Sequence, residues 1–236
     1  EGLERLKRCG VRTIELGFQA LDDRVLSRSL RGHGVGDNLR ALDLVKEEGL
    51  AAGVQLMPGL PGDCPEGFLD SLNLLIDRPP DFVRLYPALV FQGTVLARWY
   101  REGAYRPLSL AEAIALCGRA VTLLESAGIP VLRLGLQSSG SSDFLKNMLA
   151  GPFHPAFGDL VRGRLFRDKI AAAIRKLEIP AGVGLEIRAG DRDAGYLTGN
   201  GGGQLLGLQS DLSGLQLTLT RMSQLKPGEW ELRRVA

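Results

Sequence analysis

The sequence predicts an α/β protein with a parallel sheet, in the form of an incomplete barrel, followed by a small α+β C-terminal extension. Through its first two-thirds the chain alternates strand-like and helix-like segments at the spacing of βα units, which build parallel sheets. Four such units are too few for a closed eight-stranded barrel, which needs about 250 residues. The tail is different, with short strands and many glycines, so we expect one domain over 1–178 and a second over 179–236.

Four short runs of apolar residues predict the strands of this sheet. Each run has polar residues at alternate positions or is stopped by glycine and proline. We expect these strands at residues 11–18, 52–57, 82–86 and 130–136.

Helices are predicted between and after these strands from capping residues and terminal glycines. Ser109 and Glu112 form a capping box at the start of one helix, and Gly49 closes another. The helices are expected at 22–30, 37–48, 65–75, 94–102, 109–127 and 154–176. In the extension we expect strands at 184–188, 216–220 and 229–233, and a helix after Gly203.

Composition and charge narrow the class of protein. The chain has 236 residues with 44% hydrophobic content, which excludes disordered, collagen-like and coiled-coil classes. Its 29 basic and 27 acidic residues give a net charge of +2, which does not indicate a nucleic-acid-binding protein but leaves room for a local basic patch. No run of about 18 apolar residues indicates a membrane span. The chain opens with Glu1, and its first methionine is Met57, so we expect a further segment upstream.

The three cysteines, Cys9, Cys64 and Cys117, are too far apart for a disulfide framework or for metal-ligand spacing. This pattern favours a reducing, cytoplasmic compartment. The only histidines are His33 and His154, so we expect no transition-metal site made by this chain.

Polar residues at the carboxyl ends of the strands are the candidates for a site, because ligands of parallel α/β proteins bind there. Alternation places Glu15, Gly17 and Gln19 on one face of the first strand. A buried carboxylate or amide needs a partner. Either a cationic or hydroxylated ligand supplies it, or a neighbouring Arg or Lys forms an internal ion pair with Glu15. The residues alone leave both interpretations open.

Three further segments follow the same strands. Arg31 could hold a ligand carboxylate, or it could be a solvated residue after a helix. The Met57–Gly62 turn allows close approach of its backbone to a flat ligand, or it is an ordinary βα turn. Tyr86 could stack or hydrogen-bond, although a tyrosine that fills the barrel is more common.

These segments, in this order, resemble the later barrel of radical S-adenosylmethionine enzymes. The likeness is nearest to the clade of the elongator catalytic subunit and its bacterial relatives, and more distant to oxygen-independent coproporphyrinogen III oxidases. It covers roughly residues 1–175. It is carried by Glu15-Leu16-Gly17-Phe18-Gln19, Arg31-Gly32-His33, Met57-Pro58-Gly59-Leu60-Pro61-Gly62, Arg84-Leu85-Tyr86-Pro87 and the segments from Gly93 to Tyr105, Leu134 to Gln137 and Ala150 to Phe157.

The resemblance implies the second half of a partial, six-stranded barrel. Family members bind a [4Fe–4S] cluster and S-adenosylmethionine and perform radical chemistry, with tRNA as a precedent for the substrate. Their cluster cysteines form a C-x-x-x-C-x-x-C loop that this chain lacks. The resemblance therefore implies a fragment of a longer enzyme, inactive alone, whose own cysteines bind no cluster.

The resemblance also implies the cofactor-binding residues, while no catalytic residue is assigned. Glu15 and Gln19 would face the methionine and ribose end of S-adenosylmethionine, and Arg31 would meet its carboxylate. Gln55 would lie below the ribose, and Gly59 would pack by its backbone against the adenine. Tyr86 is the sixth residue predicted to bind the cofactor.

The segment Gly199, Asn200, Gly201 and Gly202 is similar to the G-x-x-G loop of KH-type RNA-binding modules. KH loops carry Lys or Arg between the glycines, whereas this segment has Asn200 and Gly201. A plain surface loop is therefore the favoured interpretation. Two alternatives to the radical enzyme follow: an RNA-binding module on a barrel scaffold, or an enzyme similar to coproporphyrinogen oxidase.

Overall fold

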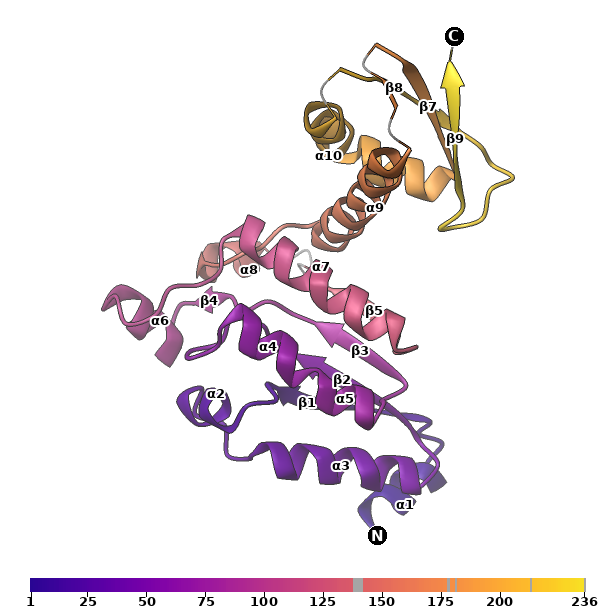
Figure 1. Cartoon of the computed structure of the whole chain (residues 1–236). Coiled ribbons are helices and arrows are strands. Elements are labelled where there is room, and N and C mark those ends of the chain that lie inside the picture. Colours follow the sequence, from indigo (N-terminus) through magenta and orange to yellow (C-terminus); the bar gives the residue numbers. More distant parts are fainter. Residues whose placement is uncertain (138–141, 178, 181, 213, 236) are drawn as a thin grey trace. The chain divides into compact units, whose positions relative to one another are not determined.

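The computed structural model describes residues 1–137, 142–177, 179–180, 182–212 and 214–235. The chain forms two compact units, Glu1–Phe157 and Gly158–Ala236 (Figure 1). The division falls at the start of helix α9 (Phe157–Lys176), and not at residue 178 as the sequence suggested. The reason is that α9 packs its apolar side chains into the core of the second unit.

The first unit is built on a four-stranded sheet with the order β1-β2-β3-β5. All three neighbouring pairs are parallel, as predicted for βα units. The strands lie close to their predicted bounds: β1 (Thr13–Gln19), β2 (Ala51–Leu56), β3 (Phe82–Leu85) and β5 (Val131–Leu134).

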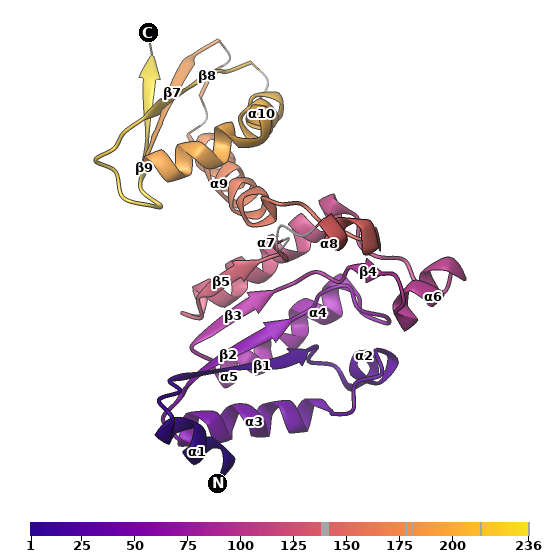
Figure 2. The same cartoon turned by 180° about the vertical axis from the view of Figure 1, so that it is seen from behind.

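Helices cover one face of this sheet. Figure 2 shows the strands in front of these helices. They are α3 (Val35–Glu47), which contacts β1 and β2, α4 (Pro65–Ser71), α5 (Asn73–Asp77) and α7 (Leu110–Ser126), which contacts β5 and α4. The strand side chains that point toward them, such as Val54, Leu56 and Leu85, are fully buried. Alternation then turns the neighbouring residues of each strand to the opposite face.

The remaining elements of the first unit flank the sheet. They are α1 (Gly2–Arg8), α2 (Asp23–Arg28), α6 (Val95–Arg101), α8 (Ser142–Asn147) and an antiparallel pair, β4 (Val90–Phe91) with β6 (Met148–Ala150). The sequence did not predict this pair, because strands of two or three residues are too short for an alternating pattern to be seen.

The second unit is a three-stranded sheet covered by two helices. Its strands are β7 (Gly184–Ala189), β8 (Gln216–Arg221) and β9 (Trp230–Val235), in the order β8-β7-β9. β7 pairs in parallel with β8 and antiparallel with β9. Its core includes Ile170 of α9, Ile187 of β7 and Leu208 of α10 (Asp191–Asp211).

The glycine-rich segment of this unit is not a loop. Residues 199–203 lie in the middle of α10, so the prediction of a helix that begins only after Gly203 is wrong. Burial of Leu197 and Leu208 on either side of the glycines overrides their low helix propensity. Among the described residues, no helix has the length and apolar character that crossing a bilayer requires.

Candidate functional site

The face of the first sheet that points away from the helices carries polar side chains on neighbouring strands. Glu15 of β1 pairs in register with Gly53 of β2, and Gln55 of β2 pairs with Arg84 of β3. Residues in register in a parallel sheet share a face, as do residues two apart along a strand. Glu15, Gln55 and Arg84 therefore lie on one face, which we call the polar face.

Arg84 bridges across the middle strand to Glu15. Its Nη2 lies 2.7 Å from Oε1 of Glu15, and its Nη1 donates to the Tyr86 hydroxyl at 3.4 Å. The Glu15 carboxylate thus has an arginine as its partner, one of the two interpretations that the sequence left open. Sequence reasoning did not assign Arg84 to the site. Its alternation with Phe82 and Tyr86, on the face of Glu15, was the signal that could have found it.

A glycine in β2 makes room for this bridge. The ring of Phe82 lies over Gly53, where a Cβ atom would be 2.2 Å from the ring. The guanidinium carbon of Arg84 is 5.8 Å from the centroid of the same ring, within the range of a cation–π interaction. The aromatic ring and the arginine are therefore held together over a position that has no side chain.

One buried hydrogen-bond donor of Arg84 is not used in these contacts. Its Nε is buried and has no hydrogen-bond partner within the part of the chain that the structure describes. The hydrogen bond with Tyr86 raises the pKa of Arg84, with a smaller contribution from the charge of Glu15, so the guanidinium stays charged. An orphaned charged donor is costly in a folded protein unless a ligand satisfies it.

Gln19 ends β1 in a strained conformation. Its φ of 67° lies in the left-handed region, although it is not a glycine, and the residue is buried. Its side-chain amide occupies the space beside Gly17, where a Cβ would be 2.6 Å away, and its carbonyl accepts from Met57 N–H at 2.8 Å. Buried Asn38 of α3 donates to the carbonyls of Phe18 and Ala20, at 3.2 and 3.4 Å. These contacts fix the backbone on both sides of Gln19, and strain of this kind is concentrated at functional sites.

Two predicted residues lie on loops that follow β2 and α2. The N–H of Gly59 donates to Asp63 at 2.8 Å, and its carbonyl accepts from the Tyr105 hydroxyl at 2.6 Å. The N–H of Gly59 is therefore already occupied, and its carbonyl has one lone pair left for a ligand. Arg31 follows α2 with an exposed side chain.

The segment compared with a KH loop lies in the other unit. Gly199, Asn200, Gly201 and Gly202 form part of α10. In a helix interior the backbone N–H groups are bonded within the helix, so they are not presented to a phosphate as in a loop. The loop conformation on which this comparison rested is therefore wrong.

The cysteines lie on three different elements. Cys9 follows α1, Cys64 precedes α4, and Cys117 is buried inside α7. Burial raises the pKa of the Cys117 thiol to about 12. Over the described ranges, no group of three or more His, Cys, Asp or Glu side chains is arranged to hold a metal ion.

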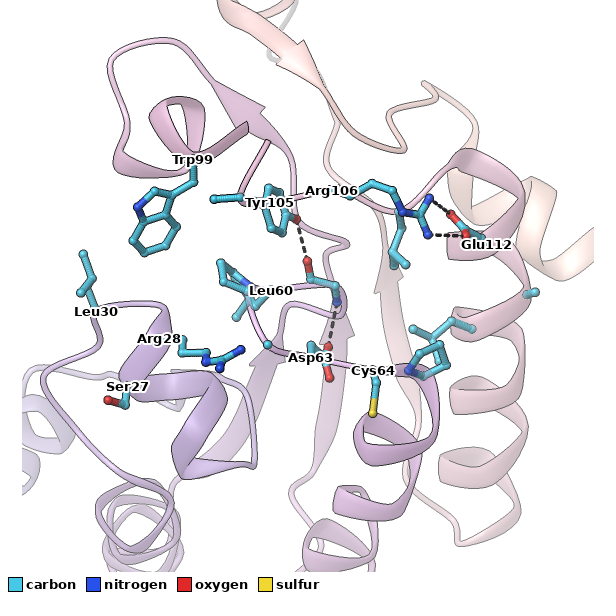
Figure 3. A pocket seen from close by; sticks show the side chains of 18 of the residues that line it. Ser27, Arg28, Leu30, Leu60, Asp63, Cys64, Trp99, Tyr105, Arg106 and Glu112 are labelled. Atoms are coloured by element: carbon cyan, nitrogen blue, oxygen red, sulfur yellow. Dashed lines mark hydrogen bonds and ion pairs between the residues drawn. The ribbon is translucent and has the colours of Figure 1, made fainter. Parts of the chain in front are cut away.

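A pocket of about 980 Å³ opens on the loop after β2 (Figure 3). It lies between the end of α2, the 59–65 loop, α6 and the start of α7. Burial, with a smaller contribution from the charge of Asp63, raises the pKa of Tyr105 in its wall to about 12, so this hydroxyl stays a donor to Gly59. Sequence reasoning did not find this pocket, because its walls come from segments that are distant in the chain.

Two family models match nearly all of the first unit. Residues 1–75 match the model described as the Radical SAM superfamily, and residues 80–167 match the model of the Radical_SAM C-terminal domain.

Individual relatives agree with these models. A tRNA uridine(34) acetyltransferase of Dehalococcoides mccartyi is 40% identical over 44% of this chain and 24% of its own length. Elongator complex protein 3 of Mus musculus is 30% identical over 49% of this chain and 22% of its own. The solved structure of Methanocaldococcus infernus Elp3 with an N-terminal deletion aligns with a TM-score of 0.63 at 27% identity, over 71% of this chain and 38% of that one. The chain thus spans about a quarter of the length of these curated relatives.

Proposed function

The chain belongs to the radical SAM superfamily, and from this premise we propose that it forms part of an enzyme whose polar face holds S-adenosylmethionine. The observation that carries the proposal is the buried, unpartnered Nε of Arg84 beside Glu15, within the described residues. S-adenosylmethionine carries an ammonium and a carboxylate on its amino-acid end. The Glu15–Arg84 pair offers an opposite charge to each of them.

The residues of the polar face fit this cofactor as a set. Glu15 would accept from the ammonium, and Arg84 would donate to the carboxylate, with Arg31 as the residue that the family resemblance assigned to that role. Gln19 and Gln55 would bond the ribose hydroxyls, and Tyr86 would stay bonded to Arg84 and hold its guanidinium in place. In this proposal, the strained backbone at Gln19 positions its amide before the cofactor arrives.

The described residues do not fit a [4Fe–4S] cluster. No group of three metal-binding side chains occurs among them, and the cysteines lie on separate elements. The proposal therefore places the cluster ligands in a segment of the full-length protein outside this chain. Together, a cluster and S-adenosylmethionine supply hydrogen abstraction in this superfamily.

We propose tRNA as the substrate class. The support is the likeness to proteins named tRNA uridine(34) acetyltransferase, 40% identical in D. mccartyi and 33% identical in Methanocaldococcus jannaschii. These matches cover about half of this chain and about a quarter of each relative, so the reaction itself is part of the proposal.

The binding of S-adenosylmethionine tests the proposal. In the full-length protein with a reconstituted cluster, equilibrium dialysis should show binding that Arg84→Met weakens about ten- to a hundred-fold, because a charge-assisted hydrogen bond is lost. Gln19→Ala should weaken it by a similar factor. The matched control is Arg40→Met, a change to an exposed arginine on α3 away from the polar face. Equal affinity in the wild type and both test variants, all folded by circular dichroism, would rule out this face as the cofactor site.

A further inference from the structure

The pocket beside the 59–65 loop is separate from the polar face. Of the six residues predicted for the cofactor, only Gly59 lines it. Its volume of about 980 Å³ is in the range of pockets that hold small molecules. Apart from Gly59, whose backbone the family resemblance places against the adenine, none of the proposed cofactor contacts lines this pocket, so an inference about it does not rest on the proposed function.

One wall of the pocket is apolar and partly aromatic. Trp99 of α6 and Leu30 extend toward each other from opposite sides, and Leu60 lies beside them on the loop (Figure 3). Trp99 is half-buried, so part of its ring system is open to the pocket. An indole of this kind offers a flat surface on which another ring can stack.

Leu30 is in an unfavourable conformation at this wall. It follows the C-cap of α2 with a φ of 56°, and the next N–H, from Arg31, bonds back to the carbonyl of Leu26 at 3.0 Å. Glycine or asparagine is the usual residue at this position of a helix end. The Leu30 side chain is nevertheless 67% exposed, so its own packing does not account for a leucine here. A ligand that covers the Leu30 side chain would account for a leucine at this position.

The polar side of the pocket holds unpaired cations. Arg106 is committed to Glu112, with hydrogen bonds of 3.2 and 2.8 Å. In contrast, Arg28 and Arg119 form no ion pair with any described residue. Figure 3 shows the Arg28 guanidinium extended toward the 59–65 loop, where its Cδ lies 2.7 Å from the position that a Cβ of Gly62 would take. The lack of a side chain at Gly62 thus lets this arginine lie along the pocket floor.

We propose that this pocket binds a flat aromatic ring that carries a phosphate, that is, a nucleotide. The ring lies between Trp99 and Leu30, and the phosphate lies at the guanidinium of Arg28, with Arg119 as a second cation. Guanidinium groups bind phosphate through two parallel hydrogen bonds, and a phosphate monoester, with a charge of about −1.5 to −2, matches two such cations better than a carboxylate does.

Isothermal titration calorimetry of the 236-residue chain with uridine 5′-monophosphate tests this proposal. Uridine is used because S-adenosylmethionine contains adenine. We expect saturable binding, at least ten-fold weaker for Arg28→Met, which keeps the aliphatic stem and removes the charge. Leu30→Gly and Leu30→Asn relieve the backbone conformation, so both should stay folded, and each should weaken binding several-fold. Arg40→Met, outside the pocket, should bind as the wild type does.

Further titrations identify the recognised groups and the source of the nucleotide. Uridine without phosphate should bind more weakly, and inorganic phosphate alone should give no heat of binding. A uridine trinucleotide that binds more tightly than the monophosphate would indicate that the natural ligand is a single-stranded RNA. A trinucleotide that binds more weakly would indicate that it is a free nucleotide. No saturable binding of the monophosphate, or wild-type affinity in both Arg28→Met and Leu30→Gly, would overturn the proposal.

Discussion

Gly53 is the position at which a single methyl group should disturb the polar face most. Its Cβ would lie 2.2 and 2.3 Å from two atoms of the Phe82 ring, so an alanine cannot enter unless that ring moves. The backbone of β2 cannot retreat, because β1 and β3 are hydrogen-bonded on either side. Overpacking of this kind costs about 1–3 kcal/mol, and we expect Gly53→Ala to lose that amount of unfolding free energy.

A double-mutant cycle can separate the clash between the new methyl group and the Phe82 ring from a general loss of stability. Phe82→Leu removes the ring atoms that the new methyl group would meet, so the double variant should recover most of the loss caused by Gly53→Ala. We expect a coupling energy of about 1–2 kcal/mol, well outside the error for independent sites. Gly36→Ala is the matched control, because nothing lies within 4 Å of a Cβ there. In the first turn of α3 it should be neutral or stabilise by about 0.5–1 kcal/mol.

Urea unfolding followed by tryptophan fluorescence measures these energies. The chain has two tryptophans, and Trp230 belongs to the second unit. In a Trp230→Phe background the signal of Trp99 therefore reports on the first unit alone, which is the unit that carries Gly53. A loss below about 0.5 kcal/mol for Gly53→Ala, or effects of the two changes that simply add, would refute this account of the packing.

Three further predictions concern single side chains. Asn38→Leu should lower the unfolding free energy by about 1–3 kcal/mol in urea, because the carbonyls on either side of Gln19 lose their donor. The hydrogen bonds from Arg106 lower the pKa of Glu112 from 4.5 to about 2, so its contribution to stability is complete above pH 4.5 and is lost as the pH falls toward 2. Thermal unfolding of Glu112→Gln should therefore depend less on pH in this window than that of the wild type. A thiol reagent at pH 8 should react quickly with the two exposed cysteines, and with Cys117 only after unfolding.

The sheet of the first unit was predictable from the sequence because its strands obey local rules. Alternation and terminal glycines and prolines determined four strands and their parallel order. The polar face followed in part: Glu15 was assigned from the alternation of its strand, and Gln55 only through the family resemblance. Arg84 was not, because its role depends on Gly53, the residue of the neighbouring strand that pairs with Glu15, and on the Phe82 ring that fills the space over it.

The second unit was less predictable because tertiary packing decides its structure. Gly163 of α9 lies where a Cβ would be 2.8 Å from the Tyr196 carbonyl of α10, and Gly207 of α10 lies beside Arg167 of α9 in the same way. These glycines permit the two helices to approach closely. Both glycines lie in stretches that the sequence predicted as helical, at 154–176 and after Gly203, but only the packing of the helices shows why glycine stands inside them. The same contacts assign α9 to this unit and move the boundary to Phe157.

The order of strands in the first sheet has a consequence for the behaviour of this chain in solution. Within the described residues, β1 stands at one edge of the sheet and β5 at the other. An edge strand presents backbone N–H and C=O groups that can pair with a strand of another molecule, and closed barrels avoid this by having no edges. The seven residues of β1 carry one carboxylate, Glu15, which Arg84 neutralises from within the sheet. The charge that would repel a second copy is therefore weakened, and self-association through β1 should increase with protein concentration.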